Sequence, residues 1–222
     1  MRKLIIGAAI LFVQMSFGQV TKELGDFDTV KVFDKLSVKV VQADQNRIVI
    51  KGSREAEVEV VNKNGILKLR MPFPKLLSGN DLSVTLYYKH IELIDANEGA
   101  TVTSNEAIKA TSFKVSAQEG AVINVDLDVD KLKVSSVSGG SITLTGKATN
   151  QDASLGAGGY LLASKLETSQ TTVSVSAGGK ADVKASTLVD AKVSAGGSIY
   201  IYGKPKQINQ KTVFGGKIEE VK

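Results

Sequence analysis

Three aspartates spaced two residues apart form the group in this sequence that most suggests chemistry. They are Asp126, Asp128 and Asp130, and they alternate with Val125, Leu127 and Val129. In a strand, this alternation puts the carboxylates on one face and the apolar side chains on the other. Such a row could gather a calcium ion, or supply paired acids for a glycosidase or lyase-type site beside Lys131 or Lys133. An EF-hand is excluded, because its sixth position is Lys131 and its twelfth is Val137. We prefer the interpretation that the row is a solvated strand face neutralised by the lysines.

A second group combines tyrosines with nearby charges near the end of the chain. It consists of Tyr160, Lys180, Asp182, Tyr200 and Tyr202. Tyr200 and Tyr202 alternate with Ile199 and Ile201, so the tyrosines point outward if the isoleucines are buried. Asp182 falls at the position of Tyr200 one repeat earlier. Because tyrosine can stack on sugar rings or anchor a protein interface, the group predicts a flat ligand-binding patch. The alternative is that the tyrosines simply cover the last repeats.

The other residue types give little support for catalysis or for a cofactor. His90 is the only histidine and there is no cysteine, so a zinc site would need three carboxylates around one imidazole. The paired glycines lead into strand-like sequence and lack a following Lys-Ser or Lys-Thr, which argues against a phosphate-binding loop. We therefore expect no catalytic residue, no cofactor and no metal.

Residues 1–18 have the organisation of a secretory signal peptide. Arg2 and Lys3 precede an apolar segment at 4–13, and Ser16 and Gly18 are small residues where a signal peptidase reads. Cleavage after Gly18 removes these two positive charges and lowers the formal net charge from +5 to +3. The signal peptide predicts that the mature chain is exported. The mature chain has no cysteine, no basic cluster and no further long apolar segment. We expect no disulfide, no nucleic-acid partner and no integral membrane segment.

Most of the mature chain alternates apolar and polar residues with period two, as at 36–40 and 82–86, which is typical of β-strands. Asn64-Gly65 predicts a hairpin between the runs at 58–61 and 66–70. Residues 71–81 contain two prolines and a Gly-Asn-Asp cluster, which predicts a loop. We therefore divide the mature chain into an N-terminal β region, 19–81, and a repeat region, 82–222. The N-terminal region either continues the repeats or caps them.

Glycine recurs at a nearly constant interval through the repeat region. The glycines are Gly99, Gly120, Gly140, Gly159, Gly179, Gly197 and Gly216, separated by 21, 20, 19, 20, 18 and 19 residues. A unit of roughly 20 residues cannot bury its apolar face alone, so neighbouring units must stack. The predicted fold is all-β: a right-handed parallel β-helix, or solenoid, with glycine-cornered rungs and an N-terminal strand and hairpin region.

Longer stretches of the sequence resemble a known family. The segment FDTVKVFDKLSVKVVQADQNRIVIKGS at 27–53, the hairpin, and the serial corners of the type VSAGG are similar to the putative auto-transporter adhesin, head GIN domain family. The similarity covers about residues 27 to 217. It implies a β-solenoid and an adhesin-like, non-enzymatic role in the bacterial envelope, often of Bacteroidetes. It implies no catalytic residues that can be transferred to this chain.

These observations lead to three hypotheses about function. The first is an exported envelope or cell-surface binding protein that presents its solenoid walls to a glycan or protein partner. The second is a carbohydrate-active β-helix enzyme, and the third is a structural protein that self-assembles through its ends, so an oligomer is compatible with the sequence. The expected location is the periplasm, the outer cell surface or the extracellular space.

Overall fold

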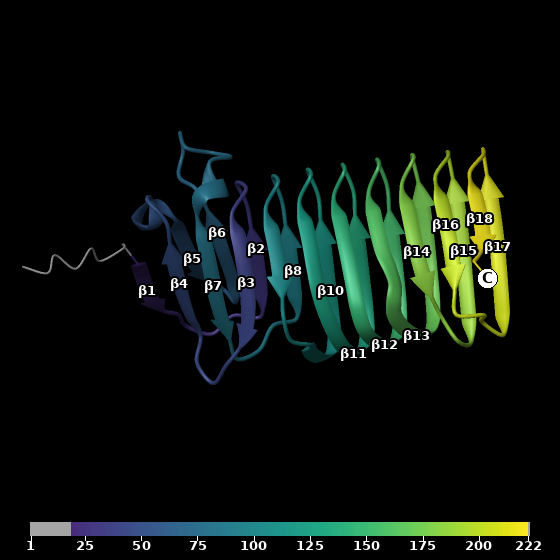
Figure 1. The fold of residues 1–222 in the computed structure, drawn as a ribbon, viewed down its shortest axis with the longest axis horizontal. Helices are drawn as coiled ribbons and strands as arrows, with labels where there is room; N and C mark the ends of the chain where they lie inside the picture. The colour runs from purple at the N-terminus through teal and green to yellow at the C-terminus, as the bar shows by residue number, and fades with distance from the viewer. Residues whose placement is uncertain (1–18, 222) are drawn as a thin grey trace, which may run out of the picture.

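The computed structural model describes residues 19–221, so the predicted signal peptide at 1–18 lies outside the described residues. The described chain forms an elongated stack of β-strands (Figure 1). Its regular secondary structure consists of strands and of two short 3-10 helices, η1 (Glu55–Glu57) and η2 (Gly79–Asp81), and turns and loops connect them. Over these residues, no helix is long and apolar enough to cross a membrane. The predicted all-β solenoid is therefore confirmed.

Each turn of the solenoid, here called a rung, consists of a strand, a tight two-residue corner and a second strand. Equivalent strands of neighbouring rungs pair in parallel. In one ladder, for example, Val115 is in register with Val134, and Val134 with Ala153. The strands of the repeats are β8 (Leu93–Ala96), β9 (Thr101–Ser104), β10 (Ile108–Ala117), β11 (Val122–Ser136), β12 (Ser141–Leu155), β13 (Tyr160–Ser176), β14 (Lys180–Lys184), β15 (Leu188–Ser194), β16 (Ser198–Tyr202), β17 (Gln207–Val213) and β18 (Lys217–Glu220). The long strands β11, β12 and β13 also bend at the opposite edge of the stack, between Asp130 and Lys131 in β11, where two exposed residues interrupt the alternation.

Each glycine pair lies at a corner: its first member is the second of the two corner residues, as in Ala157–Gly158, and its second member follows the corner. Gly158 has φ +71° with open space around it, which suits a residue without a side chain. At Gly159 a Cβ would lie 2.1 Å from the carbonyl oxygen of Ser136 on the previous rung. The predicted interval therefore mixes two positions: Gly99 and Gly120 are first members, whereas the other five predicted glycines are second members. Alanine replaces the second glycine at Ala100 and Ala121.

Backbone hydrogen bonds tie consecutive corners together along this edge. The amide of Gly99 donates to the backbone carbonyl of Glu119 at 2.9 Å, and the amide of Gly120 donates to the backbone carbonyl of Ser138 at 3.2 Å. The amide of Lys35 donates to Glu98 at 3.0 Å in the same way. Asp34 and Lys35, both at φ +60°, thus form a corner without glycine. The glycine interval could not reveal this N-terminal rung.

Part of the N-terminal region continues the stack, in an order different from that of the sequence. β2 (Thr29–Val32) and β3 (Ser37–Gln42) form a rung that pairs in parallel with β8 and β9. β6 (Ile66–Arg70) and β7 (Ser83–Tyr88) form another, which pairs in parallel with β2 and β3 on the other side. The predicted loop at 71–81 is the expanded corner between β6 and β7. The domain boundary after residue 81 stays a prediction.

Three antiparallel strands close the N-terminal end. β5 (Glu59–Lys63) forms the predicted hairpin with β6 through Asn64 and Gly65, at φ +52° and +76°. β4 (Arg47–Lys51) pairs with β7, and β1 (Gln19–Glu23) pairs with β4. The outermost rung therefore has its backbone groups covered by reversed strands.

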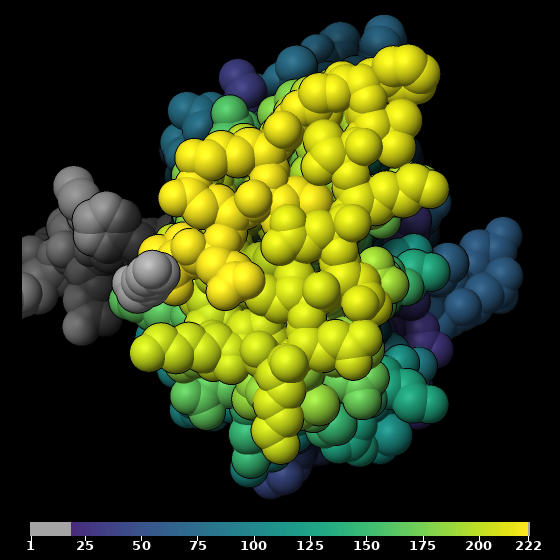
Figure 2. Space-filling view, turned by 90° about the vertical axis from the view of Figure 1, so that its right-hand side faces the viewer, coloured from purple at the N-terminus to yellow at the C-terminus, as the bar shows by residue number. Residues whose placement is uncertain are grey.

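The C-terminal end lies on the last rung, β17 and β18, whose outer edges pair with no strand among the described residues. Figure 2 looks onto this end, which the last rungs cover. Its inward positions are unusual, because Gln210 lies over Ala191, Thr212 lies over Val193 and Glu220 lies over Ile201. At these three positions polar residues replace apolar core residues of the rung below, whereas Ile208 and Ile218 still pack against the core. A partly polar last rung is expected of a capping repeat.

Inside the stack, the inward side chains of both faces form one narrow apolar core. Phe113, Ile123, Val134, Leu161 and Ile199 are all essentially inaccessible to solvent. Because every second residue points inward, outward positions are free to carry any chemistry. Functional side chains must therefore lie on the outer walls of the rungs.

Candidate functional site

The last rungs present a continuous set of outward side chains on the face that follows the corners. We call this surface the C-terminal wall. It comprises Tyr160, Leu162, Lys180, Asp182, Lys184, Ser198, Tyr200, Tyr202, Lys217 and Glu219, from the start of β13 and from β14, β16 and β18. Parallel pairing aligns equivalent outward residues in columns that run along the stack.

All five residues of the predicted tyrosine patch lie on this wall. Asp182 pairs in register with Tyr200, and Lys180 pairs with Tyr160 on the previous rung. Tyr160 therefore belongs to the column of Lys180 and not to that of Tyr200. Leu162, which is 41% exposed, takes the position next to Asp182. Tyr160 is itself 46% exposed, so the wall carries accessible apolar surface on its first rung.

Two lysines flank the ring of Tyr200. The Nζ atom of Lys180 lies 5.1 Å from the ring centroid, and that of Lys217 lies 5.6 Å from it. Both distances are within the range of a cation–π interaction. Lys217 also pairs with Glu219, whose hydrogen bond and negative charge raise the pKa of the lysine. Tyr200 is thus an aromatic platform with positive charge on the neighbouring rungs at both sides.

Asp182 has an incompletely satisfied carboxylate within this platform. Its Oδ1 atom is shielded from solvent and has no hydrogen-bond partner among the described residues. The Nζ atom of Lys180 lies 4.0 Å from it, which is too far for a direct hydrogen bond. Lys180 therefore interacts both with this carboxylate and with the ring of Tyr200.

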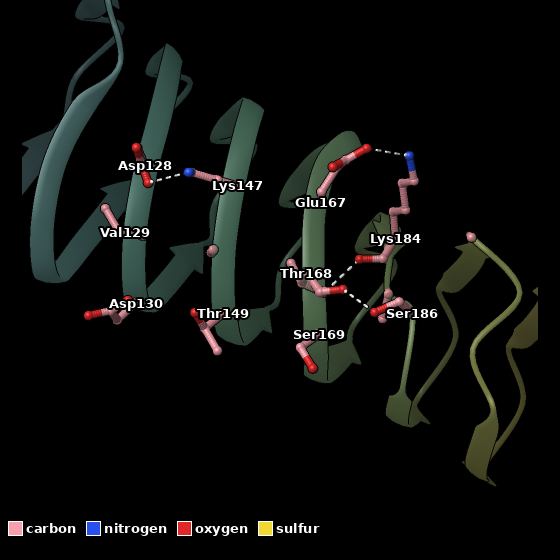
Figure 3. A pocket seen from close by; sticks show the side chains of 13 residues that line it. Asp128, Val129, Asp130, Lys147, Thr149, Glu167, Thr168, Ser169, Lys184 and Ser186 are labelled. Carbon is pink, nitrogen blue, oxygen red and sulfur yellow. Dashed lines mark hydrogen bonds and ion pairs between the residues drawn. The ribbon is translucent and has the colours of Figure 1, made fainter.

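A groove with a volume of about 480 Å³ adjoins the wall at the opposite edge from the corners. It crosses β11, β12 and β13 and reaches the segment after β14 (Figure 3). Lys184 lines the groove and pairs in register with Tyr202, so the wall and the groove meet there. The hydroxyl of Thr168 on the groove donates to the carbonyl of Lys184 at 2.7 Å.

Charges of alternating sign line this groove from rung to rung. Asp128 forms an ion pair with Lys147, with 3.3 Å between Oδ1 and Nζ (Figure 3). Glu167 forms one with Lys184, with 3.3 Å between Oε1 and Nζ. Lys109 is next to Asp128 in register on the preceding rung. The lysines and Glu167 were missed by the sequence analysis, although their charges alternate at intervals close to the length of one rung.

The three aspartates of the acidic row occupy different environments. Asp126 accepts a hydrogen bond from the hydroxyl of Thr145 at 2.9 Å and does not line the groove. Asp128 and Asp130 line it, with Asp130 exposed at the bend. In the described part of the chain, no three acidic or histidine residues come close enough to hold a metal ion.

The lysines that follow the row lie in a different groove. Lys131 and Lys133 come after the bend of β11 and line a neighbouring groove of about 340 Å³. The arrangement proposed from the sequence, with Lys131 or Lys133 beside Asp126 and Asp128, is therefore wrong. The bend breaks the alternation, so side chains before and after it face different directions. Lys147 of the next rung takes the place beside Asp128.

Comparison with known proteins agrees with this architecture. The model of the family described as putative auto-transporter adhesin, head GIN domain, matches residues 26–205. The chain belongs to this family. Among curated protein sequences, none matches it significantly.

Several solved bacterial structures share its fold at low sequence identity. A putative adhesin from Bacteroides fragilis has a TM-score of 0.84 and 19% identity, and the match covers 94% of this chain and 100% of that chain. A putative adhesin from Parabacteroides distasonis has a TM-score of 0.76 and 21% identity, and the match covers 92% of this chain and 96% of that chain. A structure from the same organism, described as a putative lipid binding protein, has a TM-score of 0.67 and 16% identity. That match covers 93% of this chain and 98% of the other. At these identities the likeness establishes the fold.

Proposed function

We propose that this chain is an exported bacterial envelope protein that binds a glycan or protein partner through its C-terminal wall and catalyses no reaction. Membership in an adhesin family supports a binding role, and the predicted signal peptide supports export. The wall combines exposed apolar surface with lysines and hydroxyl groups. Such a surface suits recognition of an extended partner better than enclosure of a small molecule.

The observation that carries the proposal is the environment of Tyr200. Its ring lies between the ammonium groups of Lys180 and Lys217, at 5.1 and 5.6 Å, on a wall that the fold does not need to bury. An aromatic face can stack on a sugar ring, and ammonium groups beside it attract a carboxylate or sulfate. A glycan with acidic sugar units is therefore the partner that best fits this wall.

Binding to an array of neutral glycans, acidic glycans and matrix proteins tests the proposal. We expect acidic glycans to give the strongest signal, and Tyr200→Ala to weaken it about tenfold, the factor that corresponds to ~1.4 kcal/mol of lost stacking. Tyr87→Ala is a matched control, because Arg47 lies 4.4 Å from the Tyr87 ring at the far end of the molecule. No binding at high micromolar concentration, or equal losses in both variants, would contradict the proposal.

The groove supports a second candidate, a carbohydrate-active enzyme. Asp128 and Asp130 of β11 line it together with Glu167 of β13, so carboxylates are present on alternate rungs, with Lys147 of β12 between Asp128 and Glu167. Asp128 and Glu167 are engaged by lysines, which favours a role in binding over one in proton transfer. Release of reducing ends or unsaturated products from polyuronides, abolished in Asp128→Asn, would establish the enzyme instead.

A further inference from the structure

The expanded corner between β6 and β7 exposes three large apolar side chains. Phe73 is 86% exposed, Leu76 is 49% exposed and Leu77 is 48% exposed. They lie within seven residues of buried Met71. The connection between β6 and β7 that carries them lies on the same edge of the solenoid as the corners (Figure 1). We call residues 71–78 the apolar tip. Exposed apolar groups concentrated in this way usually mark a contact with a partner or a membrane.

Hydrogen bonds that are buried or partly buried hold the apolar tip in place. The carboxylate of Asp34, itself 1% exposed, accepts the amides of Met71 at 3.0 Å and Leu77 at 2.9 Å. The guanidinium of Arg54 donates to the carbonyl of Ser78. Both ends of the tip are thus anchored to the fold through backbone groups. This anchoring lowers the entropic cost of ordering the backbone of the tip on binding.

The charges at the base of the apolar tip neutralise one another. Lys75 pairs with Glu57 at 2.6 Å, and Arg54 pairs with Asp81 at 2.6 Å. The guanidinium also lowers the pKa of the Asp81 carboxyl. The tip therefore presents apolar surface without a net charge, so an electrostatic attraction does not explain it.

A second exposed aromatic residue lies at the other end of the same edge. Phe214 is 90% exposed and occupies the first position of the last corner at φ +56°. Eight rung steps separate this corner from the apolar tip, which at ~4.8 Å per step corresponds to roughly 38 Å. The first corner residues between them are Asp34, which is buried, and then Glu98, Glu119, Ser138, Ala157, Ala177 and Ala195; Lys35 is the second residue of the Asp34 corner and bonds through its amide to Glu98.

We propose that this edge rests on a zwitterionic lipid bilayer, with the apolar tip and Phe214 inserted into its interface. Two convex apolar points that lie far apart on one straight edge fit a planar surface, whereas a pocket in a compact protein would accommodate only one. Lys75 can keep its ammonium group at the headgroups while its stem lies among the apolar side chains. Glu98 and Glu119 outnumber Lys35 on the edge, which disfavours anionic lipids. This attachment would leave the C-terminal wall free for a partner.

The absence of tryptophan from the chain allows a direct test. Phe73→Trp and Phe214→Trp would each place a single tryptophan at one contact point of the mature protein. With vesicles of phosphatidylcholine, we expect the emission of both variants to shift to the blue and to be quenched by brominated acyl chains. A shift in Phe73→Trp alone would overturn the edge-on arrangement, and no shift in either would overturn the proposal.

Flotation of the protein with vesicles supplies the second measurement. Replacing Phe73, Leu76 and Leu77 by alanine should reduce binding by at least about tenfold, since each is a large apolar group. Val61→Ala, which removes a 41% exposed side chain from β5, is the matched control and should bind normally. Binding should be unchanged at high salt and weaker when phosphatidylglycerol is added. Stronger binding to the anionic vesicles, lost at high salt, would instead indicate non-specific attraction of a basic protein and overturn the proposal.

Discussion

The two ends of the solenoid are protected by different physical means. At the N-terminal end, β4 and β5 run antiparallel to the outermost strands β7 and β6 and hydrogen-bond to them, and β1 pairs with β4 in turn. At the C-terminal end, β17 and β18 leave their outer edges open, but polar side chains occupy inward positions there. One end satisfies its backbone groups with added strands, whereas the other reduces the apolar surface that would make association favourable, leaving Ile208 and Ile218 over the core.

This difference separates two costs that a stacked fold must meet at its ends. Unpaired strand edges can remain in water, because water satisfies amide and carbonyl groups. Exposed core residues remain unfavourable in water, because their burial is what stabilises each rung. The C-terminal rung therefore needs a change of side chains, and the N-terminal end gains further stability from pairing.

The largest expected effect comes from disturbing the N-terminal end at Asp34. Asp34→Ala removes the acceptor for the buried amide of Met71 and the partly buried amide of Leu77, and should lower the free energy of unfolding by about 3 kcal/mol. Asp34→Asn keeps one acceptor oxygen and tolerates the left-handed corner, so it should lose less. Chemical denaturation measures both. Equal losses would show that the corner conformation, not the carboxylate, anchors the apolar tip.

Making the C-terminal end apolar should change association more than stability. Gln210→Val combined with Glu220→Ile restores core-like residues over Ala191 and Ile201. We expect this variant to form end-to-end dimers or larger species, because an open strand edge would then adjoin exposed apolar surface. Light scattering after size exclusion detects them. If the unmodified protein already forms an oligomer that resists dilution, the open end is an assembly surface, as the third hypothesis from the sequence holds.

The smallest effect is expected where the N-terminal rung meets the repeats, at Glu98. Burial, followed by the negative charges of Asp34 and Glu119, raises the pKa of Glu98 above 4.5. The folded chain therefore holds this proton to a higher pH than the unfolded chain does, and the free energy of unfolding falls as pH rises through the raised pKa. Glu98→Gln should be more stable than the natural protein at neutral pH by a few tenths of a kcal/mol.

The difference in free energy of unfolding between Glu98→Gln and the natural protein should disappear below about pH 4.5, where the carboxyl of Glu98 is protonated in the unfolded chain as well. Thermal unfolding of both proteins across this pH range measures the effect. A difference that persists in acid would mean that the substitution acts through packing and not through charge.

Local sequence signals predicted the elements of this molecule well. Asn64-Gly65 correctly indicated the hairpin, and the paired glycines correctly indicated corners, because both features depend on backbone conformations that few residues tolerate. The corner at Asp34 and Lys35 could not be found this way, since it adopts the same conformation without glycine. Buried hydrogen bonds from the loop at 71–81 stabilise it instead.

The candidate sites were predicted only in part. The outward direction of Tyr200 and Tyr202 followed from alternation, but the two lysines around Tyr200 come from neighbouring rungs. Lys147 and not Lys131 lies beside Asp128, because a bend in β11 redirects the side chains that follow it. Such pairings depend on the register between rungs, which a single repeat does not specify.

The amino-acid sequence by itself determined the strands, the corners and the division of each strand into inward and outward residues. These features depend on interactions within a few residues, through backbone conformation and the period-two alternation. Only the tertiary structure decided the stacking order, in which β6 and β7 lie outside β2 and β3, and the alignment of charges along the walls. Both depend on contacts between segments far apart in the chain, where pairing and burial choose among rungs with similar local patterns.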